Sequence, residues 1–148
     1  RDIQPRTFVS LTETIASSKH SISYYLSVGD GLISRARNEI GRMVLQDFNK
    51  TKYDYLMFID DDIVWNPKDL PIDRLISRDK DIICAAYSVR SDSLRPAIRT
   101  KQTQKLVNEG KYKKQKVILP KKVDEIEFAA GGFTLIKREC LQVVYKYS

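Results

Sequence analysis

The chain has 148 residues and carries 26 Lys and Arg against 19 Asp and Glu, a formal net charge of +7. Hydrophobic residues make up 42% and charged residues 30%, which is ordinary globular usage and excludes a disordered chain poor in large apolar residues. No apolar run approaches the roughly 18 to 20 residues that span a bilayer, and no signal-peptide pattern opens the chain. This length predicts a single domain.

The first half of the chain alternates between helical and extended patterns. Phe8, Leu11 and Ile15 recur at helical spacing and predict a helix over residues 7–18. Residues 21–28 alternate apolar and small polar side chains, which is typical of a strand. After a glycine-containing break, the helical pattern returns, and we expect a second helix that begins at Ser34 as its N-cap.

Two continuous apolar runs, residues 55–59 and 82–86, are typical of strands that are buried on both faces of a parallel sheet. Between them, Asn66 and Pro67 predict the start of a helix, with Asn as the cap and Pro at the first helical position. This alternation predicts an α/β fold with a mostly parallel sheet flanked by helices.

The second half is less regular. Residues 88–124 are polar and weakly patterned, with a short strand expected at 117–119. Residues 127–136 predict a strand interrupted by a glycine pair, and residues 137–147 predict a final helix. Cys84 and Cys140 belong to no CxxC pair, so we expect buried reduced thiols and a reducing compartment, the cytoplasm.

The positive charge is concentrated in residues 99–122, which carry +8 while the rest of the chain carries −1. This basic insert could attract an anionic partner, or it could be a solvated hairpin. Lys outnumbers Arg eight to one and Tyr112 is the one aromatic residue, so we do not expect nucleic acid as a partner. The nine basic residues are Arg99, Lys101, Lys105, Lys111, Lys113, Lys114, Lys116, Lys121 and Lys122.

Three aspartates, Asp60, Asp61 and Asp62, directly follow the apolar run 55–59. In open α/β sheets ligands bind beyond the carboxyl ends of the strands, and adjacent carboxylates there must be solvated or neutralised. Mg²⁺ or Mn²⁺ takes one or two carboxylates and completes its shell with water and phosphate oxygens. In an extended turn Asp60 and Asp62 face one side and Asp61 the other. The alternative, a helix cap in a solvated turn, needs only one aspartate.

Four segments resemble, in matching order, the motifs of GT-A-fold glycosyltransferases close to family 2. Residues 31–38 resemble the "ARN" helix start, and residues 55–63 resemble the strand with its DxD motif. Residues 81–87 resemble the following strand, and residues 130–138 the glycine segment beside the acceptor site. The resemblance covers roughly residues 21–145 and implies a Rossmann-like GT-A domain that transfers a sugar.

The resemblance also implies roles for individual residues. Asp62 would bind the Mn²⁺ or Mg²⁺ that bridges the diphosphate of a UDP- or GDP-sugar, and Asp60 would contact the metal or the ribose. Arg37 would lie near the nucleotide and Asp30 at its base, while the acceptor would be a glycan, lipid or protein. The candidate donor-binding residues are Asp30, Arg35, Arg37, Asn38, Asp60, Asp61, Gly131 and Gly132, and the candidate metal ligands are Asp60 and Asp62.

Each of these residues also has an ordinary structural interpretation. Arg35 and Arg37 could lie on a solvated helix face, and Asn38 could cap a local backbone group. The glycine pair could simply form a bulge. Trp65 could pack on a sugar face, but an anchor in the core or at a helix start is the more common role.

The chain departs from the family pattern in three places. No apolar strand precedes residue 7 to hold the nucleotide. The base of inverting members is an acid beyond the glycine segment, and here Glu139 is the one acid that follows it. A downstream His often completes the metal site of the family, but the one histidine is His20, which we expect at a surface or strand edge. We therefore expect an incomplete domain that lacks its catalytic base and could lack one metal ligand, and the start at Arg1 rather than Met fits an excised piece. Retaining chemistry is the other explanation for the missing base.

Two functions of other classes remain open on the residues alone. Paired carboxylates also serve metal-dependent nucleotidyl or phosphoryl transfer, because two-metal sites use the same ligands. A non-catalytic module could instead bind acidic polymers through the basic insert.

Overall fold

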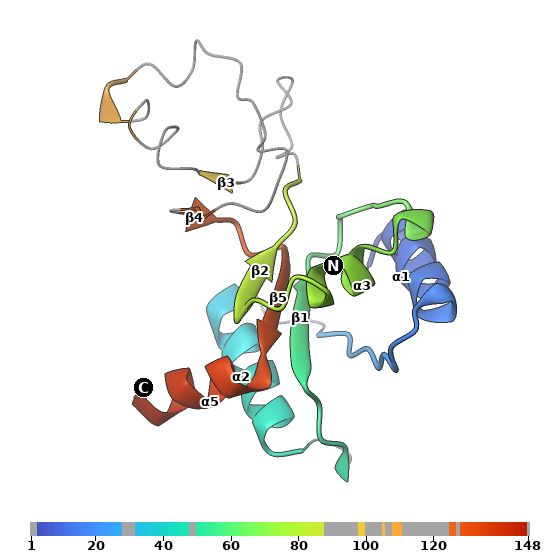
Figure 1. Ribbon diagram of the computed structural model, residues 1–148, viewed down its shortest axis with the longest axis horizontal. Helices are drawn as coiled ribbons and strands as arrows, with labels where there is room; N and C mark the ends of the chain where they lie inside the picture. The colour runs from blue at the N-terminus through green and yellow to red at the C-terminus, as the bar shows by residue number, and fades with distance from the viewer. Residues whose placement is uncertain are drawn as a thin grey trace.

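The computed structural model describes residues 3–27, 32–47, 50–87, 98–99, 105, 108–110, 125–126 and 128–147 (Figure 1). The helices are α1 (Pro5–Ser17), α2 (Ile33–Leu45), the 3-10 helix η2 (Pro67–Asp69), α3 (Pro71–Ile76) and α5 (Arg138–Tyr147). The strands are β1 (Tyr55–Ile59), β2 (Ile82–Cys84), β3 (Ile98–Arg99), β4 (Phe128–Ala129) and β5 (Phe133–Lys137). Asp30, the strand expected at 117–119 and most of the basic insert lie outside the described residues.

The main sheet has three strands in the order β1-β5-β2, and β5 is antiparallel to both neighbours. The α/β class is confirmed, but the prediction of mostly parallel pairing is wrong for the described sheet. β1 and β2 run in the same direction without pairing, because β5 lies between them. The prediction that both runs are buried on both faces is also wrong, since Leu56 is the one buried residue of β1 and Ile82 of β2 is 57% exposed. Apolar runs carry no information on which strand lies beside another.

β5 is the best-buried strand, as its central position requires. Phe133 and Leu135 are each 3% exposed. The register pairs Ile59 with Phe133 and Tyr55 with Lys137, so β5 starts beside the carboxyl end of β1. A short ladder between β3 and β4 precedes the glycine pair, which confirms that a strand is interrupted there.

The helices lie on two sides of this sheet (Figure 1). α2 and α5 pack against each other and against β1 and β5, and α3 packs on β5 from the opposite side, where η2 contacts α1. Val44, Leu56 and Leu141 form the buried cluster between α2, β1 and α5. The sheet and these helices fix the carboxyl end of β1, where the aspartates lie.

Three boundary predictions are corrected. Residues 21–27 form no strand, and Tyr24 is 53% exposed, so the alternating pattern has no buried face to stabilise it. α2 starts at Ile33 with Leu32 in the N-cap position, so Ser34 lies inside the first turn instead of capping it. The strand expected over 82–86 ends at Cys84.

The start of the next helix follows the prediction only in part. Asn66 caps as expected, since its side chain accepts a hydrogen bond from the Lys68 amide (3.2 Å). The helix is a single 3-10 turn, because Leu70 adopts a left-handed conformation (φ 44°) before α3 begins.

Both cysteines are free thiols, as predicted, and they are half-buried instead of buried. Burial raises the pKa of the Cys84 thiol. None of the helices in the described part of the chain is long and apolar enough to cross a membrane.

Candidate nucleotide-sugar site

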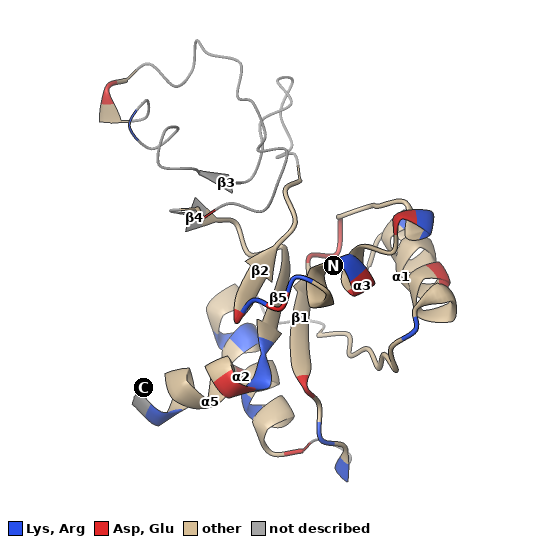
Figure 2. Cartoon of the chain, viewed as in Figure 1, with Lys and Arg blue, Asp and Glu red and all other residues tan. Residues whose placement is uncertain are grey.

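The aspartates form a tight turn directly after β1, which Figure 2 shows in red close to the N-terminus. The Ile63 amide donates to the Asp60 carbonyl (3.2 Å), which closes the turn. The Gln4 amide donates to the Asp61 carbonyl (3.0 Å), and the Asp60 amide donates to the Gly132 carbonyl (2.8 Å). Backbone hydrogen bonds from two distant segments therefore hold the turn in place.

Arg37 reaches this turn from α2. Its guanidinium donates to the Asp60 carboxylate (2.9 Å) and lies 5.3 Å from the centre of the Phe58 ring, in a cation–π arrangement. Both charged side chains keep partial contact with solvent, with 30% of the Arg37 side chain and 43% of the Asp60 side chain exposed. This pair neutralises part of the charge that the three aspartates bring together.

The other two candidates on α2 do not join this contact. Successive residues are about 100° apart around a helix, so Arg35 projects from the side of α2 opposite Arg37, and its side chain is exposed. Asn38 is exposed as well, and its carbonyl accepts a hydrogen bond from the Tyr145 hydroxyl of α5. Arg37 is the α2 candidate that forms an ion pair with Asp60.

The glycine pair lies against both charged groups. Gly131 has a φ of 55°, in the left-handed region that favours glycine, and a Cβ there would collide with the Arg37 guanidinium. A Cβ at Gly132 would collide with the Asp60 carboxylate and with the Tyr87 hydroxyl. A side chain at either glycine would therefore have to displace these groups, and the turn lies directly against the Arg37 and Asp60 side chains.

Tyr87 is the site residue that sequence reasoning missed. Its hydroxyl donates to the Ala130 carbonyl (2.8 Å) and accepts from the Gly132 amide (3.0 Å). Burial raises the pKa of Tyr87, and the nearby charges of Asp60 and Asp62 raise it further, although the Gly132 amide and Arg37 oppose them. Its position just beyond the end of β2 could have identified it, because ligands bind beyond the carboxyl ends of strands. The same argument identified the aspartates after β1.

The side chains fit a hard divalent cation of the kind expected. Asp60 and Asp62 stand two positions apart in the same tight turn and both are partly exposed, so the turn offers two carboxylates to a ligand. Across the described ranges, no group of three or more His, Cys, Asp or Glu could enclose a metal by itself. Two carboxylates without an all-protein cage match the way Mg²⁺ is bound, with phosphate and water completing the shell.

Glu139 and His20 lie elsewhere. β5 runs away from the aspartates, and its four residue steps at roughly 3.3 Å each place its far end about 13 Å along the sheet, where α5 begins with the exposed Glu139. His20 lies beside Asp73 of α3, with 3.9 Å between its Nε2 and the carboxylate, and residues around it form no strand. The described chain therefore brings neither side chain into the contacts around Asp60.

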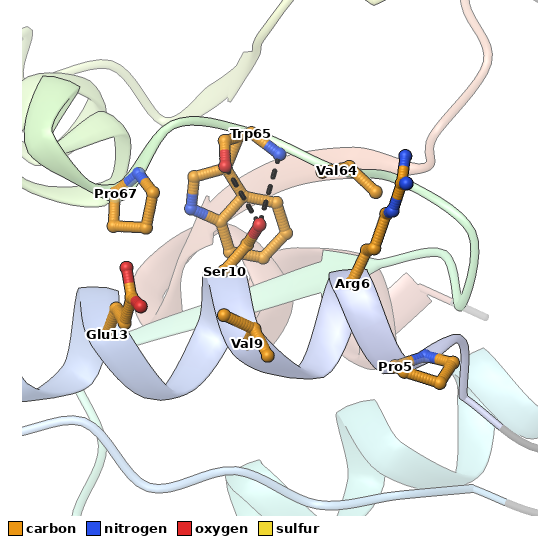
Figure 3. A pocket seen from close by; sticks show the side chains of 8 residues that line it. All are labelled: Pro5, Arg6, Val9, Ser10, Glu13, Val64, Trp65 and Pro67. Atoms are coloured by element: carbon orange, nitrogen blue, oxygen red, sulfur yellow. Dashed lines mark hydrogen bonds between the residues drawn. The ribbon is translucent and has the colours of Figure 1, made fainter.

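A shallow groove of about 360 Å³ runs between α1 and the segment after the aspartate turn (Figure 3). Trp65 forms part of its wall, but the indole is already engaged. Its N–H donates to Thr14 Oγ1 (2.8 Å), and its ring meets Phe133 edge-on with 5.1 Å between the ring centres. Trp65 thus anchors α1 to the sheet, which agrees with the structural interpretation.

Comparison with known proteins agrees with this arrangement. The sequence profile described as Glycosyl transferase family 2 matches residues 12–144. No curated protein and no solved structure matches the chain. The match includes the Arg37 helix, the aspartate turn and the glycine pair, and members of this family are glycosyltransferases of class EC 2.4 with the GT-A fold. The chain belongs to glycosyl transferase family 2.

Proposed function

We propose that this glycosyltransferase takes its sugar from a UDP- or GDP-sugar, with Mn²⁺ or Mg²⁺ as cofactor, and transfers it to a glycan, lipid or protein acceptor. The observation that carries the proposal is the meeting of four separate segments around Asp60. Arg37, Tyr87 and the pair Gly131–Gly132 all contact this carboxylate or one another. A site that combines charged side chains with the backbone of two glycines suits a diphosphate.

We assign each group of site residues a separate role in binding this donor. Asp60 and Asp62 would hold the cation, which when bound offsets the negative charge that develops on the leaving diphosphate. Arg37 supplies a fixed positive charge beside them, and its planar fork suits phosphate oxygens. The glycine turn removes the side chains that would otherwise fill this space, so the backbone can approach the donor closely.

The donor hypothesis is tested by calorimetry with Mn²⁺ and UDP or GDP. We expect binding of the nucleotide that depends on the metal, and we expect Asp62→Asn to weaken metal binding at least tenfold, since one of two carboxylate ligands loses its charge. Asp69→Asn, in η2, is the matched control, because this aspartate is exposed and lies seven positions beyond Asp62. Absence of metal-dependent binding in the wild type would contradict the proposal.

The chemistry is tested by the product formed. Sugar transfer or donor hydrolysis releases a nucleoside diphosphate from the nucleotide sugar. A nucleotidyl transferase releases pyrophosphate from a nucleoside triphosphate instead. Detection of pyrophosphate, without any nucleoside diphosphate from UDP- or GDP-sugars, would favour the alternative function of the paired carboxylates.

A further inference from the structure

We propose that Tyr87 is a positioning residue, whose hydroxyl fixes the acidic turn at Asp60 by holding the glycine turn against it. The inference rests on the proposed function, because it assigns Tyr87 a role in metal and donor binding at that site. Tyr87 itself is not proposed as a ligand. It acts through Gly132.

Gly132 is the residue that links the two turns. Its N–H donates to the Tyr87 hydroxyl (3.0 Å) and also approaches the Ala130 carbonyl (2.5 Å), which in turn accepts from that hydroxyl (2.8 Å). Its carbonyl accepts from the Asp60 amide (2.8 Å). The Tyr87 hydroxyl therefore completes a ring of hydrogen bonds with the Gly132 amide and the Ala130 carbonyl. The Gly132 carbonyl, in turn, binds the backbone of Asp60.

The side chains of Tyr87 and Asp60 also meet at Gly132. A Cβ built on Gly132 would meet both the Tyr87 hydroxyl and the Asp60 carboxylate, so these two groups lie on the same side of the glycine and close to one another. The carboxylate is confined by the hydroxyl on one side and by Arg37 on the other. A metal ligand held in this way keeps its geometry before the cation arrives, which lowers the cost of binding.

The phenol ring is supplied by the chain just after β2, while the turns it connects follow β1 and precede β5. Because β5 lies between β1 and β2, Tyr87 reaches the glycine turn from the strand on the far side of β5. This placement gives the acidic turn support from all three strands of the sheet. Removal of the hydroxyl should loosen the turn without disturbing the sheet.

The test compares Tyr87→Phe with Tyr24→Phe, which removes a hydroxyl from an exposed ring that packs edge-on against Phe8. The first readout is hydrogen exchange of the Asp60 and Gly132 amides without metal. The second is the affinity for Mn²⁺ alone, measured by calorimetry. We expect Tyr87→Phe to accelerate exchange at both amides and to weaken Mn²⁺ binding about two- to tenfold, as for the loss of one or two hydrogen bonds, while Tyr24→Phe changes neither.

The outcomes separate this inference from the proposed function. If the wild type binds Mn²⁺ and Tyr87→Phe leaves exchange at Asp60 unchanged, the positioning role is wrong and the proposed function stands. Faster exchange with unaltered Mn²⁺ affinity would also overturn it, because the hydroxyl would then be a structural contact only. If the wild type binds no Mn²⁺, the proposed function fails and the positioning role fails with it.

Discussion

Arg37 and Asp60 lie 23 positions apart in the sequence, and their side chains form an ion pair of 2.9 Å at the end of β1. The guanidinium occupies the side of the carboxylate that faces α2, above the Phe58 ring. A bound cation and Arg37 therefore compete for the same negative charge, whereas a diphosphate would attract both. We therefore expect Arg37 to weaken the binding of the cation alone and to strengthen the binding of the diphosphate.

Arg37→Ala should tighten the binding of Mn²⁺ alone and weaken the binding of UDP or GDP in the presence of Mn²⁺. We expect each change to be about three- to tenfold, because the pair is half exposed and its charges are partly screened. Calorimetric titrations with and without nucleotide measure both affinities. The control is Arg42→Ala, on the same helix, since Arg42 is exposed and pairs only loosely with Glu39 (3.9 Å). Two affinities that move in the same direction would contradict this assignment.

Gly131→Ala should destabilise the protein and disturb the site together. The left-handed backbone costs an alanine about 1 to 2 kcal/mol, and the added Cβ must also displace the Arg37 guanidinium. Gly110 is a matched control, because it has a similar φ of 68° with nothing within 4 Å of a built Cβ. Urea unfolding should show a loss for both variants, while Mn²⁺ and nucleotide affinities should change only in Gly131→Ala. An equal effect of both variants on binding would show that the contact with Arg37 is unimportant.

The aspartate turn and the Arg37 helix could be predicted from sequence because each is a local pattern with a fixed place in the fold. An apolar run that ends in charged residues predicts a strand and its end, and the structure has the end at Ile59 directly before Asp60, although Leu56 is the one buried residue of this strand. The position of β5 between β1 and β2 could not be predicted, because it depends on pairing between residues 50 to 82 positions apart. Tyr87 was missed for the same reason, since its partners lie more than 40 positions away.

Burial on α1 shows how tertiary contacts override apolar spacing. The helix is confirmed, but its buried face consists of Thr7, Ser10, Leu11 and Thr14, while Phe8 is 37% exposed. Ser10 donates to the Trp65 carbonyl (2.8 Å), and Thr14 accepts from the Trp65 indole. A buried hydroxyl costs little when it is hydrogen-bonded, so these contacts explain the burial of Ser10 and Thr14, whereas the buried Thr7 hydroxyl has no hydrogen-bond partner among the described residues. No local pattern on α1 reveals a partner 51 to 55 residues ahead.

Lys137 should make stability depend on acid pH through Asp79. Its ammonium lies 2.6 Å from the Asp79 carboxylate and 3.6 Å from Asp81, and its hydrogen bond holds the pKa of Asp79 below the ordinary value. A lowered folded-state pKa stabilises the protein above the ordinary aspartate pKa near 3.9, and this contribution is lost as the pH falls through the folded-state pKa. The wild type should therefore be more stable than Asp79→Asn at pH 6, and the two should converge as the pH falls below the ordinary aspartate pKa and through the lowered folded-state pKa. Urea midpoints at both pH values test this, with Asp69→Asn as the control that shows no such convergence.

Arg138 joins α5 to the end of α2, and lysine should not replace it. Its buried guanidinium donates to the carbonyls of Val44 (2.8 Å) and Leu45 (3.0 Å) and pairs with Asp47 (2.8 Å). These carbonyls belong to the last turn of α2, where intrahelical donors run out. A single ammonium cannot span the three acceptors, so Arg138→Lys should cost about 1.5 to 3 kcal/mol of unfolding free energy. The exposed Arg42→Lys should stay within about 0.5 kcal/mol, and an equal loss in both would refute the capping role.

The effects of Gly132→Ala and Tyr87→Phe on the free energy of unfolding should not be additive. Gly132→Ala creates a collision with the Tyr87 hydroxyl, and Tyr87→Phe removes that hydroxyl. The added methyl group would meet the Tyr87 hydroxyl and the Asp60 carboxylate, and overpacking of this kind typically costs about 1 to 3 kcal/mol. In the Tyr87→Phe background only the carboxylate remains in the way, so the cost of Gly132→Ala should fall by at least about 0.5 kcal/mol, beyond the additivity expected of independent sites.

Urea unfolding of both single variants and the double variant gives the coupling energy directly. The matched cycle pairs Gly132→Ala with Tyr24→Phe, whose ring lies against Phe8 and makes no contact with the added methyl group. That control cycle should be additive. If the Tyr87 cycle is additive as well, the hydroxyl does not confine Gly132, and the acidic turn must be held by its backbone hydrogen bonds and Arg37 alone. A coupling confined to Tyr87 would instead show that the phenol, the glycine and the carboxylate share one tightly packed space, so that the shape of the proposed metal site is fixed before any ligand binds.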